Sequence, residues 1–228
     1  MSGSARPSSG EVRSRLRTGA ASLGTDLDEA QLAALERFLE ELMLWNTRTN
    51  LVGERDWQAL VDRHLLDALA AAPLLRALGD GLRIVDVGSG AGLPGVPLAV
   101  AVRPRAMWLV EPRKKRASFL RSVRRALPGF GLDVVEAHGE DVASAPENRG
   151  LFDAVVSRAT LSDEDLRTCA EPLLREGGLL VAYRGSRENP TQRGGGGSGT
   201  WTGPIVQRYV LGAARRAFQL DVWTRRFT

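Results

Sequence analysis

The sequence predicts an α/β protein built on a doubly wound, mostly parallel sheet with an N-terminal helical cap. From residue 82 onward, short runs rich in β-branched residues alternate with helical segments, which is typical of βαβ units. The first of these strands ends in a glycine-rich turn, which is where an open sheet commonly binds a ligand. Amphipathic helical segments precede that strand, so we expect them to lie outside the sheet.

The residues before the first strand predict a tail followed by a helical cap. Residues 1–24 begin with a stretch rich in Ser, Gly and Pro, and we expect them to form a disordered tail. The cap covers residues 25–80. Leucines recur at helical spacing over 26–45, which predicts a first helix. A second helix is expected over 56–78, and Pro73 should kink or split it because proline lacks the backbone N–H that a helix interior needs.

The remaining residues, 81–228, form the expected sheet domain. Five strands are predicted at residues 82–87, 106–110, 132–137, 152–157 and 178–183. Helices are predicted at residues 94–102, 114–127 and 162–174. The glycine-rich segment 186–204 is typical of a flexible loop. Two further strands, at 205–211 and 217–224, are expected to close the sheet as an antiparallel pair.

The strongest motif is Asp-Val-Gly-Ser-Gly-Ala-Gly, which begins at Asp86 where the first strand ends. A dinucleotide fingerprint would need a third glycine where Leu93 stands, and a phosphate-binding P-loop would need Gly-Lys-Ser/Thr at the helix start. The remaining pattern, Asp-x-Gly-x-Gly-x-Gly, matches the S-adenosylmethionine loop of class I methyltransferases. Glu111 ends the second strand, where a carboxylate can accept both ribose hydroxyls. We therefore expect Asp86, Gly88, Gly90 and Glu111 to bind S-adenosylmethionine.

Composition excludes several other classes of protein. The chain has 228 residues, of which 43% are hydrophobic and 25% charged, which argues against intrinsic disorder. The single cysteine, Cys169, excludes a disulfide-stapled secreted domain, and with no signal peptide we expect the cytoplasm. The sequence contains no run of 18 or more apolar residues, so no membrane span is expected. Because His64, His138 and Cys169 lack ligand spacing, no metal site is expected.

Several further motifs follow one another in a fixed order between residues 38 and 185. They are Leu44-Trp45-Asn46, Asn50-Leu51, Arg63-His64-Leu65-Leu66-Asp67, the glycine loop through Leu98, Lys115-Arg116, Ser157-Arg158-Ala159 and Gly177-Gly178. On these residues the chain resembles the ribosomal small-subunit methyltransferase G family. The resemblance implies transfer of a methyl group from S-adenosylmethionine to N7 of a guanine in 16S rRNA.

The resemblance also implies roles for individual residues. Cofactor contacts are implied at Gly88, Leu93, Gly139, Glu140 and Arg158. On the acceptor side it implies Asn50, Arg63, His64 and Arg184, the last at a position where the family usually has lysine. His64 is alternatively a packing histidine, and Asn50 a turn or capping residue. From Ser186 onward the chain departs from the family, on the side where the acceptor should bind.

A dense basic segment follows the second strand. Residues 103–125 contain nine basic side chains and one acidic one, whereas the whole chain has a net charge of only +4. Within it, Lys114, Lys115, Arg121 and Arg125 lie on a predicted helix, where we expect them to bind the phosphates of rRNA. The alternative is an ordinary solvated helix face.

Three functions compete at this point. The first is an rRNA guanine-N7 methyltransferase, which would act as a monomer on 16S rRNA or the small ribosomal subunit, without a membrane partner. Because N7 carries a free lone pair, the reaction requires no strong general base. The second is a paralogue with the same cofactor fold and another acceptor, such as a small molecule, which the divergent C-terminal third favours. The third is a non-catalytic RNA-binding or assembly protein, which has no use for a complete cofactor pocket.

Overall fold

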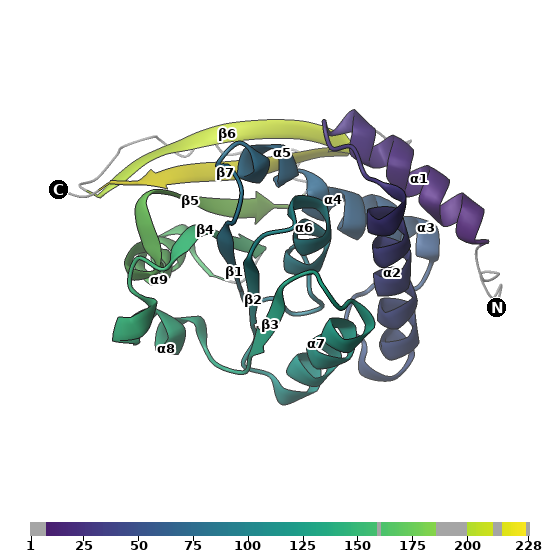
Figure 1. Ribbon diagram of the computed structural model, residues 1–228, viewed down its shortest axis with the longest axis horizontal. Helices are drawn as coiled ribbons and strands as arrows, with labels where there is room; N and C mark the ends of the chain where they lie inside the picture. The colour runs from purple at the N-terminus through teal and green to yellow at the C-terminus, as the bar shows by residue number, and fades with distance from the viewer. Residues whose placement is uncertain (1–7, 159–160, 186–199, 212–215, 227–228) are drawn as a thin grey trace.

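The computed structural model describes residues 8–158, 161–185, 200–211 and 216–226 (Figure 1). These residues form a seven-stranded sheet in the order β3-β2-β1-β4-β5-β7-β6. The strands are β1 (Arg83–Val87), β2 (Ala106–Val110), β3 (Leu132–Val135), β4 (Phe152–Arg158), β5 (Leu174–Arg184), β6 (Trp201–Leu211) and β7 (Arg216–Arg225). The first five are parallel, and β7 pairs antiparallel with both β5 and β6. The predicted fold class and the closing antiparallel pair are confirmed.

The N-terminal segment corrects one prediction. We expected disorder over residues 1–24, yet α1 (Ser9–Ser22) is a helix that begins with a capping box between Ser8 and Glu11. Leu16 is fully buried on its inner face, so tertiary packing orders a segment whose composition suggested a tail. Residues 1–7 lie outside the described part of the chain.

The helices of the expected cap lie beside the sheet and share its core. They are α2 (Glu29–Thr49), α3 (Trp57–Leu60), a π-helical turn at Val61–Leu65, α4 (Leu66–Leu69) and α5 (Ala72–Arg76). Pro73 stands in the first turn of α5, where its missing N–H costs nothing, and the predicted second helix is indeed split. One continuous hydrophobic cluster joins these helices to the sheet.

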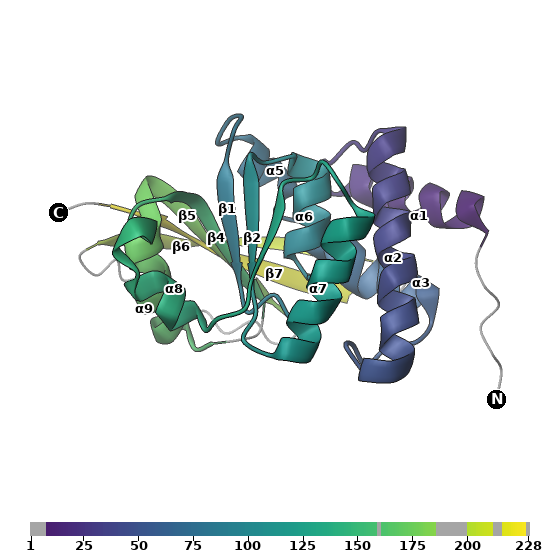
Figure 2. The ribbon, with the colours of Figure 1, turned by 60° about the horizontal axis from the view of Figure 1, so that its bottom comes forward.

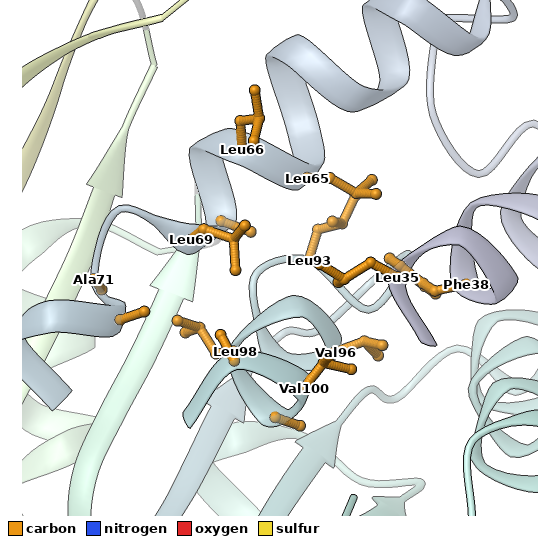
Figure 3. Packing of buried hydrophobic residues seen from close by; sticks show 14 of the residues in the cluster. Leu35, Phe38, Leu65, Leu66, Leu69, Ala71, Leu93, Val96, Leu98 and Val100 are labelled. Atoms are coloured by element: carbon orange, nitrogen blue, oxygen red, sulfur yellow. The ribbon is translucent and has the colours of Figure 1, made fainter. Parts of the chain in front are cut away.

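Helices cover both faces of the sheet, as Figure 2 shows. Helices α6 (Gly95–Val102) and α7 (Lys114–Ala126) lie on the face toward α2, while α8 (Gly139–Ser144) and α9 (Asp163–Leu173) lie on the other. Side chains of β1 alternate between the two cores: Ile84 belongs to the first and Val85 to the second. Figure 3 shows the first core, where Leu65 and Leu69 face Val96 and Leu98 of α6.

The remaining differences from prediction concern short elements. Helix α8 and a 3₁₀ turn at Pro146–Asn148 had no signal of their own in the sequence. Residues 201–204, which the sequence placed in the glycine-rich loop, belong to β6, whereas 186–199 lie outside the described residues.

The strand order reverses between β1 and β4. From β1 the chain adds β2 and β3 on one side of the sheet, and it then adds β4 and β5 on the other side. The crevice beside the β1 loop is therefore the expected ligand site.

We predict that Leu16→Ala lowers the free energy of unfolding by about 2–5 kcal/mol, because it leaves a cavity under α1. Leu44→Ala is the matched control: this leucine is 57% exposed, and its loss should change stability by less than about 0.5 kcal/mol. Urea unfolding followed by circular dichroism measures both. Equal effects of the two substitutions would show that α1 does not contribute to the core.

Candidate active site

The glycine loop between β1 and α6 presents bare backbone at the carboxyl edge of the sheet. Gly88, Gly90 and Gly92 all have positive φ angles, of 75°, 56° and 76°, which residues with a side chain rarely adopt. The N–H groups of Gly88 and Ser89 both donate to the carbonyl oxygen of Val110, each at 2.9 Å. These bonds tie the loop to the end of β2, so the backbone can approach a ligand closely.

Asp86 is a buried side chain that fixes the end of this loop to the start of α6. Its side chain is fully buried, and Oδ2 accepts a hydrogen bond of 2.9 Å from the backbone N–H of Gly95 at the start of α6. A Cβ atom on Gly95 would lie 2.4 Å from Leu109 Cδ2 and 2.6 Å from Asp86 Oδ2, so only glycine fits. Burial raises the pKa of Asp86 to about 7. The contacts therefore make Asp86 a support of the loop; the proposed contact with the cofactor itself stays a prediction.

Glu111 is a buried carboxylate that follows β2 and is bonded to the glycine loop. It is only 3% exposed, and its two carboxylate oxygens accept hydrogen bonds of 2.9 Å from the N–H groups of Gly90 and Arg113. Each oxygen has a second lone pair, so the carboxylate can accept two hydroxyl groups while it stays fixed to the loop. The glycine loop and this carboxylate together fit the nucleoside part of S-adenosylmethionine.

The other predicted cofactor residues surround the same edge in different ways. Leu93 is buried and its side chain packs into the core near Leu65 (Figure 3), so only its backbone belongs to the loop surface. Gly139 begins α8, and a Cβ atom there would lie 2.7 Å from a methyl group of Val87. Glu140 is exposed at the rim of a hollow of about 390 Å³ between α8 and α9.

Arg158 ends β4, the neighbour of β1 at the point where the strand order reverses. Its Nη1 lies 3.1 Å from Oδ2 of Asp67, a buried carboxylate on α4. The hydroxyl of Tyr209 on β6 donates to the other oxygen of that carboxylate at 2.5 Å. The sequence predicted neither of these two contacts of Asp67. Asp67 closes the Arg-His-Leu-Leu-Asp motif, and Tyr209 was expected as a packing residue, with stacking on an RNA base as the alternative.

The structure brings Arg63 and His64 to one carboxylate, Glu54. His64 Nε2 lies 2.7 Å from Glu54 Oε2, and Arg63 Nη1 lies 3.5 Å from Oε1. Burial lowers the pKa of His64, and the positive charge of Arg158 acts in the same direction, so the imidazole is mainly neutral near pH 7. Its Nδ1 is buried and has no hydrogen-bond partner among the described residues. Glu54, like Asp67, was missed in the sequence.

The other two residues predicted on the acceptor side occupy distinct places. Asn50 is the exposed C-cap of α2 in the left-handed conformation, with φ of 47°, which agrees with the alternative of a capping residue. Arg184 forms ion pairs with Asp163 at the start of α9 and with Asp221 on β7. Its guanidinium therefore lies on the α9 face of the sheet, whereas Arg158 lies on the α4 face.

The four predicted RNA-binding residues are spread along α7. This helix connects β2 to β3, so it starts at the carboxyl edge of the sheet and ends at the opposite edge. Lys114 and Lys115 are exposed at its start, close in sequence to Glu111. Arg121 pairs with Glu136 at 2.7 Å, and Arg125 lines a hollow of about 680 Å³ near the beginning of β3. Only the two lysines therefore lie at the edge that carries the glycine loop.

No group of three or more His, Cys, Asp or Glu side chains in the part of the chain that the structure describes is arranged to hold a metal ion. Among the same residues, no helix combines the length and the apolar character needed to cross a membrane.

Solved structures share this fold at low sequence identity. Fibrillarin from Aeropyrum pernix, solved in complex with natively bound S-adenosyl-L-methionine, matches with a TM-score of 0.50 and 16% identity over 68% of this chain and 74% of its own. A putative transferase from Pyrococcus horikoshii matches with a TM-score of 0.52 and 11% identity over 71% of this chain and 64% of its own. Together with the loop and Glu111, the fold defines a class I methyltransferase.

The family is narrower than this class. The family model for rRNA small subunit methyltransferase G matches residues 31–196, and the chain belongs to this family. Ribosomal RNA small subunit methyltransferase G from Chloroflexus aggregans is 39% identical over 162 residues, which cover 71% of this chain and 67% of the relative. Its counterpart from Cellvibrio japonicus is 37% identical over 176 residues, which cover 76% of this chain and 78% of the relative.

Membership of this family confirms three predictions. The chain is an enzyme, its methyl donor is S-adenosylmethionine, and its substrate is an RNA of the small ribosomal subunit. The individual site residues remain predictions, to which the geometry above adds Asp67, Glu54 and Tyr209.

We predict that Asp86 makes stability depend on pH. Because its pKa in the folded protein is about 7, the folded state keeps this proton between pH 5 and 7 while the unfolded chain loses it. The stability of the wild type relative to Asp86→Asn should therefore fall by roughly 3 kcal/mol from pH 5 to pH 8. Urea unfolding at each pH measures this, with Asp133→Asn at an exposed position of β3 as control. A constant difference between wild type and Asp86→Asn would contradict it.

Proposed function

We propose that this chain methylates N7 of a guanine in 16S rRNA through the site at the carboxyl edges of β1, β2 and β4. The observation that carries the proposal is Glu111, buried and hydrogen-bonded to Gly90, within a chain that belongs to the rRNA small subunit methyltransferase G family. A carboxylate fixed against a glycine loop is suited to a ribose, and the rest of the cofactor then extends toward Arg158.

S-Adenosylmethionine supplies an electrophilic methyl group, and the residues of this chain provide binding and orientation. Glu111 accepts the ribose hydroxyls, while the backbone of Gly88 and Gly90 allows close approach. Guanine N7 attacks with a lone pair that is already free, so no side chain has to remove a proton first. Holding two reactants in line contributes about 7–11 kcal/mol in favourable cases, which leaves positioning as the main task of the site.

The acceptor guanine is proposed to lie beside Arg63, His64 and Asn50. Because Nε2 of the neutral imidazole donates to Glu54, Nδ1 remains as an acceptor of one hydrogen bond and adds no positive charge. This suits a reaction whose product ring is cationic, since a protonated histidine would oppose the developing charge. Arg184 is proposed as a more distant contact, because Asp163 and Asp221 already pair with its guanidinium.

The RNA backbone is proposed to follow α7. Lys114 and Lys115 lie at the cofactor edge, so they would hold the phosphates next to the target base, and Arg121 and Arg125 would hold more distant ones. The partner is 16S rRNA or the small ribosomal subunit, the enzyme acts as a monomer, and a ribosomal substrate implies the cytoplasm.

The reaction is tested by methyl transfer from labelled S-adenosylmethionine to small ribosomal subunits, naked 16S rRNA and a small-molecule panel. We expect label in one of the two RNA samples and, after nuclease digestion, a mass-spectrometric signal for N7-methylguanosine. Glu111→Gln should lower the rate at limiting cofactor by at least about tenfold, because hydrogen bonds to a charged group are among the stronger ones. Label in the small-molecule panel alone would favour the paralogue with another acceptor.

We predict that the double substitution Lys114→Glu with Lys115→Glu weakens RNA binding and flattens its dependence on salt. Each lost phosphate contact should reduce the slope of log K against log salt by about 1. Arg121→Glu with Arg125→Glu should act less, since Arg121 already pairs with Glu136. Filter retention over a salt series measures the slope, and Arg149→Glu, at another exposed position, is the control. An unchanged slope in the lysine variant would mean that the start of α7 is merely solvated.

A further inference from the structure

Asp67 is a buried acid that joins three distant parts of the chain. It lies on α4 and is only 4% exposed. One carboxylate oxygen pairs with Arg158 at the end of β4, with 3.1 Å between Oδ2 and Nη1. The other accepts the hydroxyl proton of Tyr209 on β6, at 2.5 Å between Oδ1 and Oη. Both oxygens are thus engaged, one by a cation and one by a neutral donor.

We propose that Asp67 is a positioning residue that fixes the guanidinium of Arg158 at the mouth of the cofactor site, and that Tyr209 completes this arrangement from the C-terminal hairpin. We call the three residues the Asp67 clamp. The inference rests on the proposed function, since it takes Arg158 to contact S-adenosylmethionine. It assigns a role in the reaction to β6, which lies beyond the residues that match the family.

The surroundings of the clamp favour this role over simple packing. A buried carboxylate is costly unless it is paired and hydrogen-bonded, and a hydrophobic residue would fill the same space with less penalty. The neighbouring residue is held as well, because the hydroxyl of Tyr183 donates to the carbonyl oxygen of Ala68 at 2.6 Å. The carboxylate is therefore held in place on α4, and Arg158 is the member of the clamp at the carboxyl end of β4, next to β1.

Tyr209 is itself oriented by its own strand pair. Its ring stacks on Phe218 of β7, with 5.8 Å between centroids and 16° between planes. The phenol can therefore approach Asp67 from a single direction, and its hydroxyl limits rotation of the carboxylate. A carboxylate that cannot rotate presents one oxygen to Arg158 and holds the planar guanidinium in one orientation.

The charge of Asp67 depends on the groups that face it. Burial raises its pKa, whereas Arg158, the Tyr209 hydroxyl and His64 lower it, and Tyr183 on β5 also faces this carboxylate. Removal of the Tyr209 hydroxyl therefore raises the pH at which Asp67 takes up a proton and releases Arg158.

The test compares cofactor affinity in single and double variants of the full chain. Tyr209→Phe keeps the ring stack and removes only the hydroxyl, and we expect about fivefold to tenfold weaker binding of S-adenosylmethionine by calorimetry. Asp67→Asn should weaken binding at least as much. In the Arg158→Lys background, Tyr209→Phe should have no further effect, because the residue through which it acts has lost its planar fork. Ser122→Ala, which removes a hydroxyl that donates to Glu41 away from the clamp, should change affinity less than twofold.

A pH series separates positioning from stability. As pH falls, the affinity of Tyr209→Phe for S-adenosylmethionine should decline at a higher pH than that of the wild type, and circular dichroism should show both folded. Wild-type affinity and the same pH dependence in Tyr209→Phe would overturn the clamp, as would additive effects of Tyr209→Phe and Arg158→Lys. Absence of cofactor binding by the wild type would instead overturn the proposed function.

Discussion

The active site depends on one buried hydrogen bond, from the N–H of Gly95 to the carboxylate of Asp86. This bond joins the end of β1 to the first turn of α6. Because Gly95 has no side chain, the strand and the helix can approach each other closely. The glycine loop is held between these ends, so its backbone reaches the position where Gly90 donates to Glu111. The geometry of the cofactor site thus follows from a contact that lies beneath it. Such an arrangement keeps the ligand surface free of side chains while the support remains in the core.

The glycine loop and the carboxylate beside it were predictable from the sequence, because their positions follow from local patterns. The glycine spacing after Asp86 and the carboxylate at Glu111 follow from strand ends, and strand ends are visible in the pattern of β-branched residues. The order of strands follows from alternation with helices. Helix α1 was missed because its stability comes from burial of Leu16 against other helices, which composition does not reveal. Local sequence signals therefore predicted the strands and helices of the sheet domain, whereas tertiary packing determines that the N-terminal segment forms α1.

The Asp67 clamp could not be predicted in the same way, since it depends on long-range pairing. In the sequence, Arg158 lies 91 positions and Tyr209 lies 142 positions after Asp67. In the fold, the three side chains share one buried cluster. Their meeting requires the antiparallel hairpin of β6 and β7 to extend the sheet beyond β5, which brings β6 to Asp67 on α4. A motif can mark Arg158 and Asp67 as important, but only the fold shows that they touch. Tyr209 was expected only to pack or to stack on a base, because no local pattern indicates a hydrogen bond to Asp67.

Alternation along neighbouring strands decides which arginine faces the cofactor side. Arg158 stands opposite Tyr183 in the β4–β5 ladder, so both side chains lie on the face toward α4. Arg184 is the residue after Tyr183 in β5, so its side chain points to the other face, where Asp163 and Asp221 pair with it. Two arginines that end adjacent strands therefore serve different purposes: one joins the Asp67 clamp, and the other ties β5 to α9 and β7. A shift of one residue in the β4–β5 register would exchange these faces, so the pairing of β4 with β5 also determines the chemistry of the pocket.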